Sequence, residues 1–412
     1  MRRATPRART TAAAIALAAC AWPAPASATP RVETVDGLKI VYLEGSPYDI
    51  GHQHGELLGE WVRRSSAQLL GYFEDYLKVP WIGGWLVDWW LDRSWGESLP
   101  FIPTDYLEEL QGLSDAAGVP MNDLWRIHAI PDRTYACANF AAWGRATADG
   151  RMIHLRNLDW NIEAGIQRYP VIFVVHPTGK RIYASAGWAG FIGVLTGVNE
   201  HGLSIGQVGA ETADVDYHGL PMPFLIRRVL EESASLGDAV RIVTKGPRTV
   251  GINYLIADAE ARRAVAIETT RNFAAVFEAD DPKEHEIEYA RPWPDVVFRA
   301  DTAMDRRIRE RQLASGGQPT RPGLEPPTGS AYTTRYLGQC AGLLAHYGRL
   351  DAAGAQQIAR AVAPDSNVQS VVFAWPDVDV ANADGITPAA RRPYHRLPLG
   401  RWRRRASRAC AR

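Results

Sequence analysis

The chain has little of several features that would mark a class of protein at once. Its 412 residues include only four cysteines and five lysines, and its basic and acidic residues balance to a formal charge of zero. After the first 30 residues no apolar run is long enough to cross a bilayer, so we expect the body of the chain to lie outside the membrane. No internal repeat is present, and the scarcity of lysine gives no support to catalysis through a lysine amine. What is present is 46% hydrophobic residues, enough for a substantial core.

The zero net charge hides an uneven distribution. Four arginines lie within residues 1–28 and nine within residues 391–412, and neither segment contains an acidic residue. Removing these 13 bases from 46 leaves 33 bases against 46 acids, so the body of the chain carries a charge of −13. We expect the basic tail, 391–412, to be solvated, with peripheral contact to an anionic membrane as the alternative, and we predict no nucleic-acid partner.

The first 28 residues have the order of an export signal. Arginines come first, an apolar stretch spans 11–22, and Ala26-Ser27-Ala28 precedes a predicted cleavage site before Thr29. We therefore expect a periplasmic or extracellular protein. Leu17-Ala18-Ala19-Cys20 also resembles a lipoprotein cleavage box, so lipid anchoring at Cys20 is the alternative.

Loss of Cys20 with the signal would leave three cysteines in an oxidising compartment. Because three is an odd number, one thiol must stay free or pair between chains. A Cys340–Cys410 disulfide is one hypothesis, and it would leave Cys137 as the free thiol.

Apolar spacing predicts a helix-rich front and a mixed body. Helices are expected over 50–65, 66–77 and 103–117, and again over 224–235, 237–244 and 351–362. Strands are expected over 171–176, 182–186, 190–198, 203–208, 254–257, 264–268 and 368–374, with a Gly/Pro-rich loop at 316–330. This order favours an α+β body built in layers over a parallel βαβ array.

A hairpin should bring charged side chains to Cys137. The simplest version has strands over 137–143 and 151–157 and places residue 157 opposite residue 137, whereas a tighter Asp149-Gly150 turn would shift the register. Either version returns Arg156 and Asp159 to the neighbourhood of Cys137. Arg156 would lower the pKa of the thiol, and Asp159 could hold an ammonium group. The spacing alone also fits an ordinary surface salt bridge on a hairpin.

A cysteine at a chain start carries its own base. The free α-amino group, which titrates near about pH 8, can take up the thiol proton. Cys137, in Tyr135-Ala136-Cys137-Ala138-Asn139-Phe140, suggests such a nucleophile, which would become an N-terminus by self-cleavage after Ala136.

A longer motif carries a family resemblance. The pattern Cys-x-x-Phe-x-x-Trp-Gly-x-x-Thr-x-Asp-Gly-x-x-x-His-x-Arg-Asn-x-Asp-Trp, from Cys137 to Trp160, resembles the signature of the acyl-coenzyme A:6-aminopenicillanic acid acyltransferase family. These are C45-type autoproteolytic acyltransferases and hydrolases of the N-terminal nucleophile superfamily. Similar segments recur at 43–48, 51–55, 187–203 and 366–370.

The resemblance implies a fold and a maturation step. The fold is a four-layer αββα sandwich, and the chain is made as an inactive precursor that is cleaved before Cys137. The implied organisation is a signal at 1–28, a helix-rich prosegment at 29–136, a catalytic domain at 137–390 and the basic tail. The two pieces are expected to stay associated. Many relatives have glycine where Ala136 stands here.

The resemblance also implies roles. Bile-salt hydrolases, penicillin V acylases and the acid ceramidase group share a cysteine with an Arg-x-x-Asp pair, matched by Cys137, Arg156 and Asp159. Asn253 resembles an asparagine that supplies one oxyanion donor, and the backbone N–H of Gly209 is the second by rough alignment. Trp188 and Phe191 are substrate-contact candidates, because they lie in the glycine-rich family segment.

The expected activity is transfer of an acyl group through a Cys137 thioester. The substrate would be a small amide or acyl compound, and the sequence leaves open the acyl chain, whether water or an amine accepts it, and the oligomeric state. No cofactor is expected, and acyl-coenzyme A is a possible acyl donor.

Three other motifs point elsewhere. Gly202-Leu203-Ser204-Ile205-Gly206 fits a serine-esterase elbow, which needs a strand, a sharp turn and a helix, whereas a plain strand is expected here. Trp81, Trp85 and Trp89 could form a lipid-binding stripe of a non-catalytic secreted protein, although such stripes more often pack in the core. His52-x-His54 is half a metal site without a third ligand, and we predict no metal.

Overall fold

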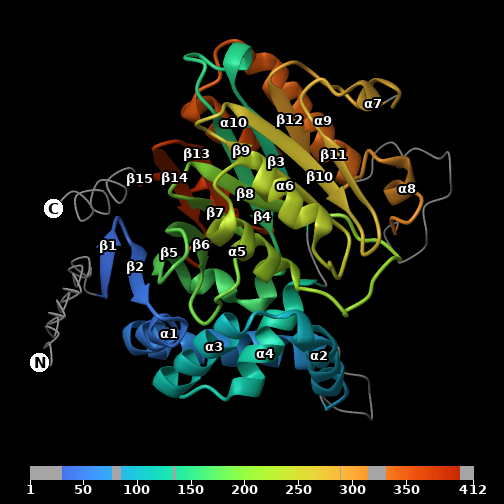
Figure 1. Ribbon diagram of the computed structural model, residues 1–412. Coiled ribbons are helices and arrows are strands. Elements are labelled where there is room, and N and C mark those ends of the chain that lie inside the picture. Colours follow the sequence, from blue (N-terminus) through green and yellow to red (C-terminus); the bar gives the residue numbers. More distant parts are fainter. Residues whose placement is uncertain (1–29, 77–84, 133–135, 288, 314–330, 400–412) are drawn as a thin grey trace, which may run out of the picture.

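The computed structural model describes residues 30–76, 85–132, 136–287, 289–313 and 331–399. In this part of the chain two β-sheets pack face to face, and helices cover the outer face of each sheet (Figure 1). Strands β3 (Ala136–Ala142) and β4 (Ile153–Asp159) of one sheet contact β8 (Leu203–Gly209) of the other, so the two sheets are the two inner layers. These four layers confirm the predicted α+β class and its αββα arrangement.

The larger sheet has nine strands in the order β1-β2-β5-β6-β7-β8-β9-β10-β11. Their bounds are β1 Arg31–Val35, β2 Leu38–Gly45, β5 Pro170–Pro177, β6 Tyr183–Trp188, β7 Thr196–Asn199, β8 Leu203–Gly209, β9 Ile252–Asp258, β10 Arg263–Thr269 and β11 Ala274–Phe277. The predicted strands are confirmed except at 190–198, where only the last part is extended. The pair β2 and β5 is parallel, and the other neighbouring pairs are antiparallel.

The smaller sheet has six antiparallel strands in the order β12-β3-β4-β13-β14-β15. Their bounds are β3 Ala136–Ala142, β4 Ile153–Asp159, β12 Val296–Arg299, β13 Asn367–Ala374, β14 Asp377–Asn382 and β15 His395–Pro398. Strand β15 lies inside the segment predicted as a solvated tail, so the described part of that segment, up to residue 399, includes sheet structure.

Helices lie around the two sheets, and those before Cys137 gather at one end of the molecule (Figure 1). Before Cys137 they are α1 Pro47–Tyr76, α2 Trp85–Ser98, α3 Thr104–Ala117 and α4 Met121–Ala129; after it they are α5 Met222–Glu232, α6 Leu236–Lys245, α7 Pro282–His285, α8 Arg306–Arg309, α9 Ala331–His346 and α10 Ala352–Val362. Helices α5 and α6 contact the nine-stranded sheet, and α9 and α10 contact the six-stranded sheet. None of the described helices is both long and apolar enough to span a bilayer.

Helices α1 and α3 pack unusually closely, because glycine removes side chains at their contact. A Cβ atom on Gly51 would lie 1.8 Å from the backbone oxygen of Glu109, and one on Gly112 would lie 2.2 Å from that of Tyr48. The two helices predicted over 50–65 and 66–77 are one continuous helix, α1, since nothing between them interrupts the apolar spacing.

The segment before Cys137 is not helical throughout. It also contributes β1 and β2 to the nine-stranded sheet, where β2 pairs with β5 from Lys39↔Val171 to Gly45↔Pro177. The predicted division at residue 136 therefore separates strands that belong to one sheet, the nine-stranded sheet. The domain limits remain predictions, and the signal, Cys20, Trp81, the 316–330 loop and Cys410 lie outside the described residues.

Candidate active site

The predicted hairpin forms, with a register one residue different from the simplest version. Its loop is closed by the Gly144 N–H, which donates to the Gly150 carbonyl over 3.2 Å, and both glycines have positive φ, 54° and 74°. Cys137 pairs with Leu158, and Asn157 pairs with Ala138 instead. Because side chains alternate along a strand, Arg156 and Leu158 share the face of β4 that Cys137 occupies on β3.

The Cys137 thiol is buried between the two sheets. Its side chain is 1% exposed, and Arg156 donates from Nη2 to Sγ over 3.3 Å. Gln207 on β8 places Oε1 4.0 Å from the same sulfur. Space for Arg156 depends on a glycine in the facing sheet, since a Cβ on Gly206 would lie 2.5 Å from the Arg156 Cγ.

This environment keeps the thiol protonated in the uncleaved chain. Burial raises the pKa of Cys137 to about 11, and Arg156 opposes that rise without cancelling it. A thiol is a weak nucleophile in this state. The site therefore needs a base close to Sγ before Cys137 can react efficiently.

A second set of groups holds the main chain of Cys137. The Cys137 N–H donates to Asp301 Oδ1 over 2.9 Å, and Arg335 Nη1 donates to the Cys137 carbonyl over 3.3 Å. The same Nη1 lies 3.0 Å from Asp159 Oδ2 and 3.0 Å from Asp301 Oδ2. One guanidinium thus bridges two buried carboxylates next to the backbone of Cys137.

Both carboxylates are difficult to ionise in this setting. Burial raises the pKa of Asp159 to about 6 and that of Asp301 to about 7, while Arg335 lowers both pKa values. Asp159 also accepts from Asn367 Nδ2 at its Oδ1 over 2.8 Å. The structure thus brings Cys137, Arg156 and Asp159 together, with Arg156 on the thiol and Asp159 on the main-chain side.

The two predicted oxyanion donors are placed less directly. Asn253 is buried on β9 and donates from Nδ2 to the carbonyl of Ala300 over 3.2 Å. It thereby contacts the residue next to Asp301, and it does not line the cavity beside Cys137. Gly209 ends β8 opposite Ile252. Their role in catalysis remains a prediction.

Asp301, Arg335 and Gln207 were missed by sequence reasoning. Asp301 and Arg335 lie 164 and 198 residues from Cys137, and no motif surrounds them. Gln207 lies within a correctly predicted strand, two residues before Gly209. It shares a face with Leu203 and Ile205, and a polar side chain in phase with these apolar residues was the signal that could have identified it.

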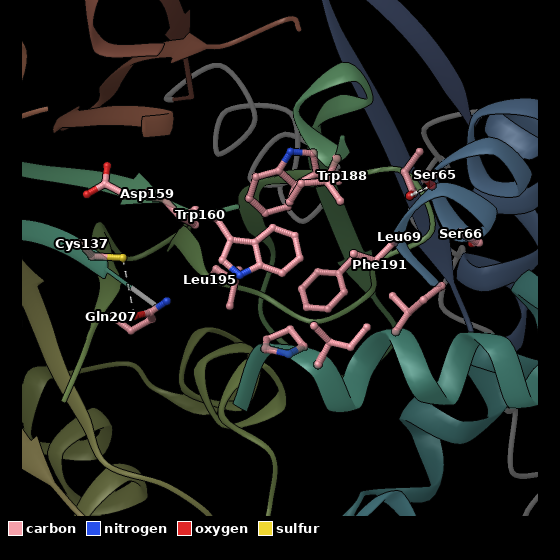
Figure 2. A pocket seen from close by; sticks show the side chains of 16 residues that line it. Ser65, Ser66, Leu69, Cys137, Asp159, Trp160, Trp188, Phe191, Leu195 and Gln207 are labelled. Atoms are coloured by element: carbon pink, nitrogen blue, oxygen red, sulfur yellow. Dashed lines mark hydrogen bonds between the residues drawn. The ribbon is translucent and has the colours of Figure 1, made fainter. Parts of the chain in front are cut away.

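A cavity that opens partly to solvent lies beside the thiol; together with the solvent space at its mouth it occupies about 640 Å³. Figure 2 shows Cys137 and Gln207 at one end and Ser65 and Ser66 at the other. The lining is mostly apolar and includes both predicted contact residues; it consists of Ser65, Ser66, Leu69, Ile127, Ile130, Pro131, Cys137, Leu158, Asp159, Trp160, Ile166, Trp188, Ala189, Phe191, Leu195 and Gln207. The first six of these precede Cys137, so both sides of the predicted cleavage point build the cavity.

Helices before Cys137 also fix the loop that carries Phe191. Ser65 Oγ donates to the Ala189 carbonyl over 2.6 Å, while His54 Nε2 accepts from the Gly190 N–H over 3.1 Å and His128 Nε2 from the Ile192 N–H over 2.9 Å. Burial lowers the pKa of His54 to about 3 and that of His128 to about 4, so both rings are neutral acceptors.

These contacts give His54 a structural role in place of half a metal site. His52 is partly exposed and lies beside Glu56. Among the described residues, no group of three or more His, Cys, Asp or Glu side chains is arranged to hold a metal ion.

Ser204 does not have the geometry of a serine elbow. It lies inside strand β8, is 3% exposed and does not line the cavity. His154 Nδ1 lies 2.7 Å from its Oγ, and His154 Nε2 lies 2.8 Å from Asn139 Oδ1. The esterase alternative is wrong in this respect, because the three side chains form a buried polar cluster between the sheets.

Comparison with known proteins gives one family match. The family model described as acyl-coenzyme A:6-aminopenicillanic acid acyl-transferase matches residues 145–282. This range includes Arg156 and Asp159 and begins after Cys137.

Curated relatives are distant. Protein dcd1B of Dictyostelium discoideum is 27% identical over 264 residues, which is 60% of this chain and 53% of that protein. The N-acylethanolamine-hydrolyzing acid amidase of Rattus norvegicus is 21% identical over 54% of this chain and 60% of its own length. Acid ceramidase of Rattus norvegicus is 23% identical over 48% and 57%. The chain thus spans about half to three fifths of the length of these relatives.

Solved structures give weaker matches. An ortholog of N-acylethanolamine-hydrolyzing acid amidase from Caenorhabditis elegans covers 64% of this chain and 100% of its own, with 17% identity and a TM-score of 0.43. A mutant of the conjugated bile acid hydrolase from Clostridium perfringens covers 64% and 93%, with 12% identity and a TM-score of 0.39. The fold assignment accordingly rests on the sheets and helices of this chain.

Proposed function

We propose that the chain, which the acyl-coenzyme A:6-aminopenicillanic acid acyl-transferase family model matches over residues 145–282, is a self-processing amide hydrolase or acyltransferase with Cys137 as its nucleophile. One observation carries the proposal: Arg156 donates to the Cys137 sulfur at one end of an apolar cavity. An arginine beside a thiol stabilises the thiolate, and the cavity offers room for an acyl group.

Self-cleavage is the first step of the proposed function. The Cys137 sulfur attacks the carbonyl carbon of Ala136, the C–N bond to Cys137 breaks, and the thiol proton passes to the departing nitrogen. Water then adds to the resulting thioester and the C–S bond breaks. The products are a carboxyl group on Ala136 and a free thiol and α-amino group on Cys137.

Turnover uses the new amine. The α-amino group takes the thiol proton, and the thiolate, stabilised by Arg156, attacks the carbonyl of the substrate. The leaving amine or thiol receives that proton, and the acyl thioester on Cys137 is then released to water or to an acceptor amine. Burial keeps the thiol neutral without this base, which explains why the precursor would be inactive.

Asn253 and the backbone N–H of Gly209 are the proposed oxyanion donors. Replacing Asn253 with alanine should lower turnover about 10²-fold, because loss of one such donor commonly costs that much. The Asn253 amide would have to leave the Ala300 carbonyl to act in this way. Turnover by Asn253→Ala at the wild-type rate would remove this residue from the mechanism.

The cavity supports an apolar acyl group as the transferred unit. Trp188, Phe191 and Leu195 present carbon surface to the space beside the sulfur (Figure 2). Two of the curated relatives are named for N-acylethanolamines and ceramide, which are amides with a large apolar part. We propose a small-molecule amide of this kind, with acyl-coenzyme A as a possible donor and no bound cofactor.

The two pieces should remain associated after cleavage. Arg227 on α5 forms buried ion pairs with Glu109 on α3 and Glu231, so α3 and α5 are joined across the cleavage point. The pairing of β2 with β5 joins the same two pieces in one sheet. Gel filtration of the processed protein should therefore recover both pieces together.

Mass spectrometry tests the proposal directly. Purified protein should yield pieces of 29–136 and 137–412, which would also support export with signal removal before Thr29. Retention of lipid on Cys20 would favour anchoring. The Cys137→Ala variant should stay joined at residue 136 and be inactive against a panel of N-acyl amides and acyl thioesters. Ser204→Ala is the matched control and should be processed normally. An intact wild-type chain with full activity would overturn the proposal.

A second candidate function rests on the exposed face of α2. Trp85 is 64% exposed and Trp89 is 51% exposed, four residues apart on one helix. We propose peripheral contact of this face with a lipid surface. Sedimentation of the Cys137→Ala protein with anionic phospholipid vesicles should show binding that Trp85→Ser with Trp89→Ser removes. Equal sedimentation of both proteins would exclude this face.

A further inference from the structure

Two side chains that have no part in the proposed chemistry of the thiol form hydrogen bonds with the main chain of Cys137. Asp301 accepts the Cys137 N–H, and Arg335 donates to the carbonyl oxygen of the same residue. The nitrogen held by Asp301 is the leaving atom of self-cleavage and afterwards the base of turnover. Asp301 therefore touches a reacting atom in both steps.

Around this nitrogen, acidic side chains outnumber basic ones. Asp159 and Asp301 both face Arg335, and both are almost fully buried. The other guanidinium nearby, that of Arg156, is directed at the thiol and acts on Asp159 more weakly than Arg335 does. On the main-chain side, the described residues thus place two carboxylates against one cation.

A further cation would balance this site, and cleavage creates one at the right atom. We propose that Asp301 is a catalytic residue that receives the α-ammonium group of Cys137 once the bond to Ala136 is broken, an inference that rests on the proposed self-cleavage. The nitrogen gains the thiol proton in cleavage, takes up a second proton released when the new Ala136 carboxyl group ionises, and so becomes an ammonium group without leaving Asp301. Two carboxylates, Asp159 and Asp301, then face two cations, Arg335 and the ammonium group.

Asp301 sets the basicity of the amine. A carboxylate in contact with an ammonium group favours its charged form and raises its pKa. The groups facing Asp301 are Arg335 from α9, Asp159 from β4 and Cys137 from β3, and Gln312 donates to the backbone oxygen of Asp301. Removing the Asp301 charge should lower the pKa of the amine, and removing the Arg335 charge should raise it.

Two variants with opposite expected signs test the inference. Turnover requires the neutral amine, so its rate rises with pH through the amine pKa. Asp301→Asn should move this acid limb to lower pH by about one unit, and Arg335→Gln should move it to higher pH. Asp301→Asn should also slow self-cleavage at least tenfold, because the new ammonium loses its counter-charge.

Asp379→Asn is the matched control. Asp379 is also buried and paired with an arginine, Arg396, but it lies on β14, at the other end of the six-stranded sheet from β12 and β3. The Asp379→Asn protein should undergo self-cleavage at the wild-type rate, and its turnover should rise with pH over the same range as in wild type. Thermal unfolding of each variant separates local from general effects. A folded Asp301→Asn protein that never cleaves also supports the inference.

The outcomes distinguish this inference from the proposed function. If wild type is not cleaved and Cys137→Ala retains activity, the proposed function fails and the inference falls with it. If wild type is cleaved and requires Cys137, but Asp301→Asn shows an unchanged cleavage rate and acid limb, only the role of Asp301 is overturned. Shifts of the same sign in Asp301→Asn and Arg335→Gln would overturn it as well.

Discussion

Cys137 has two sides that the fold treats differently. On the thiol side, one arginine faces one sulfur, and the surroundings are apolar. On the main-chain side, one arginine faces two carboxylates. Burial penalises charge on both sides, so the thiol stays neutral and the carboxylates have raised pKa values. The difference suits the proposed ammonium group of Cys137, which would add a second cation on the main-chain side.

Removing the cation on the thiol side should have the largest effect. Arg156→Gln keeps a hydrogen-bond donor of similar reach but loses the charge, and the thiol pKa should rise. We expect turnover to fall about 10²-fold, since a neighbouring opposite charge shifts a pKa by one to three units. Alkylation of Cys137 by iodoacetamide should slow in parallel. Arg396→Gln removes an arginine paired with Asp379 and is the control. Unchanged alkylation in Arg156→Gln would mean that Arg156 does not act on the sulfur.

Filling the cavity should change selectivity and leave the main-chain side intact. Leu69 on α1 lines the cavity, so Leu69→Trp should shift preference to shorter acyl chains by at least about tenfold in kcat/KM, the lower end of the effect of one methylene group in an apolar pocket. Self-cleavage should be unaffected. Ala67→Trp places the same side chain at an exposed position of the same helix and should leave the chain-length profile unchanged. An unaltered profile in Leu69→Trp would mean that the acyl group lies elsewhere.

The buried Asp301 carboxyl group should make the stability of the uncleaved chain depend on pH. Because folding raises the pKa of Asp301 from an unfolded value near 4 to about 7, its contribution to stability is fully present below about pH 4 and is lost as pH rises to about 7. Buried neutral histidines oppose this trend, so the comparison must be made within one background. Between pH 5 and 8, the double variant Cys137→Ala, Asp301→Asn should lose several degrees less in melting temperature than Cys137→Ala.

Thermal unfolding of both proteins across that pH range checks this expectation. Equal losses of melting temperature in the two proteins would show that ionisation of Asp301 does not destabilise the uncleaved chain. Cleaved wild-type protein should resemble the double variant, because its ammonium group compensates Asp301.

Local sequence patterns predicted the site residues of the hairpin better than the residues that reach Cys137 from distant parts of the chain. The hairpin around Gly144 and Gly150 is a short-range feature, so it placed Arg156 and Asp159 near Cys137. Its register was off by one, because β3 ends at Ala142, one residue earlier than predicted, and β4 starts at Ile153, two residues later. Asp301 and Arg335 reach Cys137 only through the pairing of β12 with β3 and the packing of α9, which no local motif encodes. The full length of α1 was likewise not predicted, because two amphipathic segments whose apolar faces are aligned form one helix.

The parallel pair of β2 and β5 has a consequence for how the processed protein could be made again. Before cleavage, the strand that ends at Gly45 and its partner are parts of one chain, and their meeting does not depend on protein concentration. After cleavage the same pairing would join two molecules, so the midpoint of unfolding should fall as the sample is diluted. The precursor would then serve as the tether that assembles a sheet which the separate pieces, at low concentration, would not rebuild.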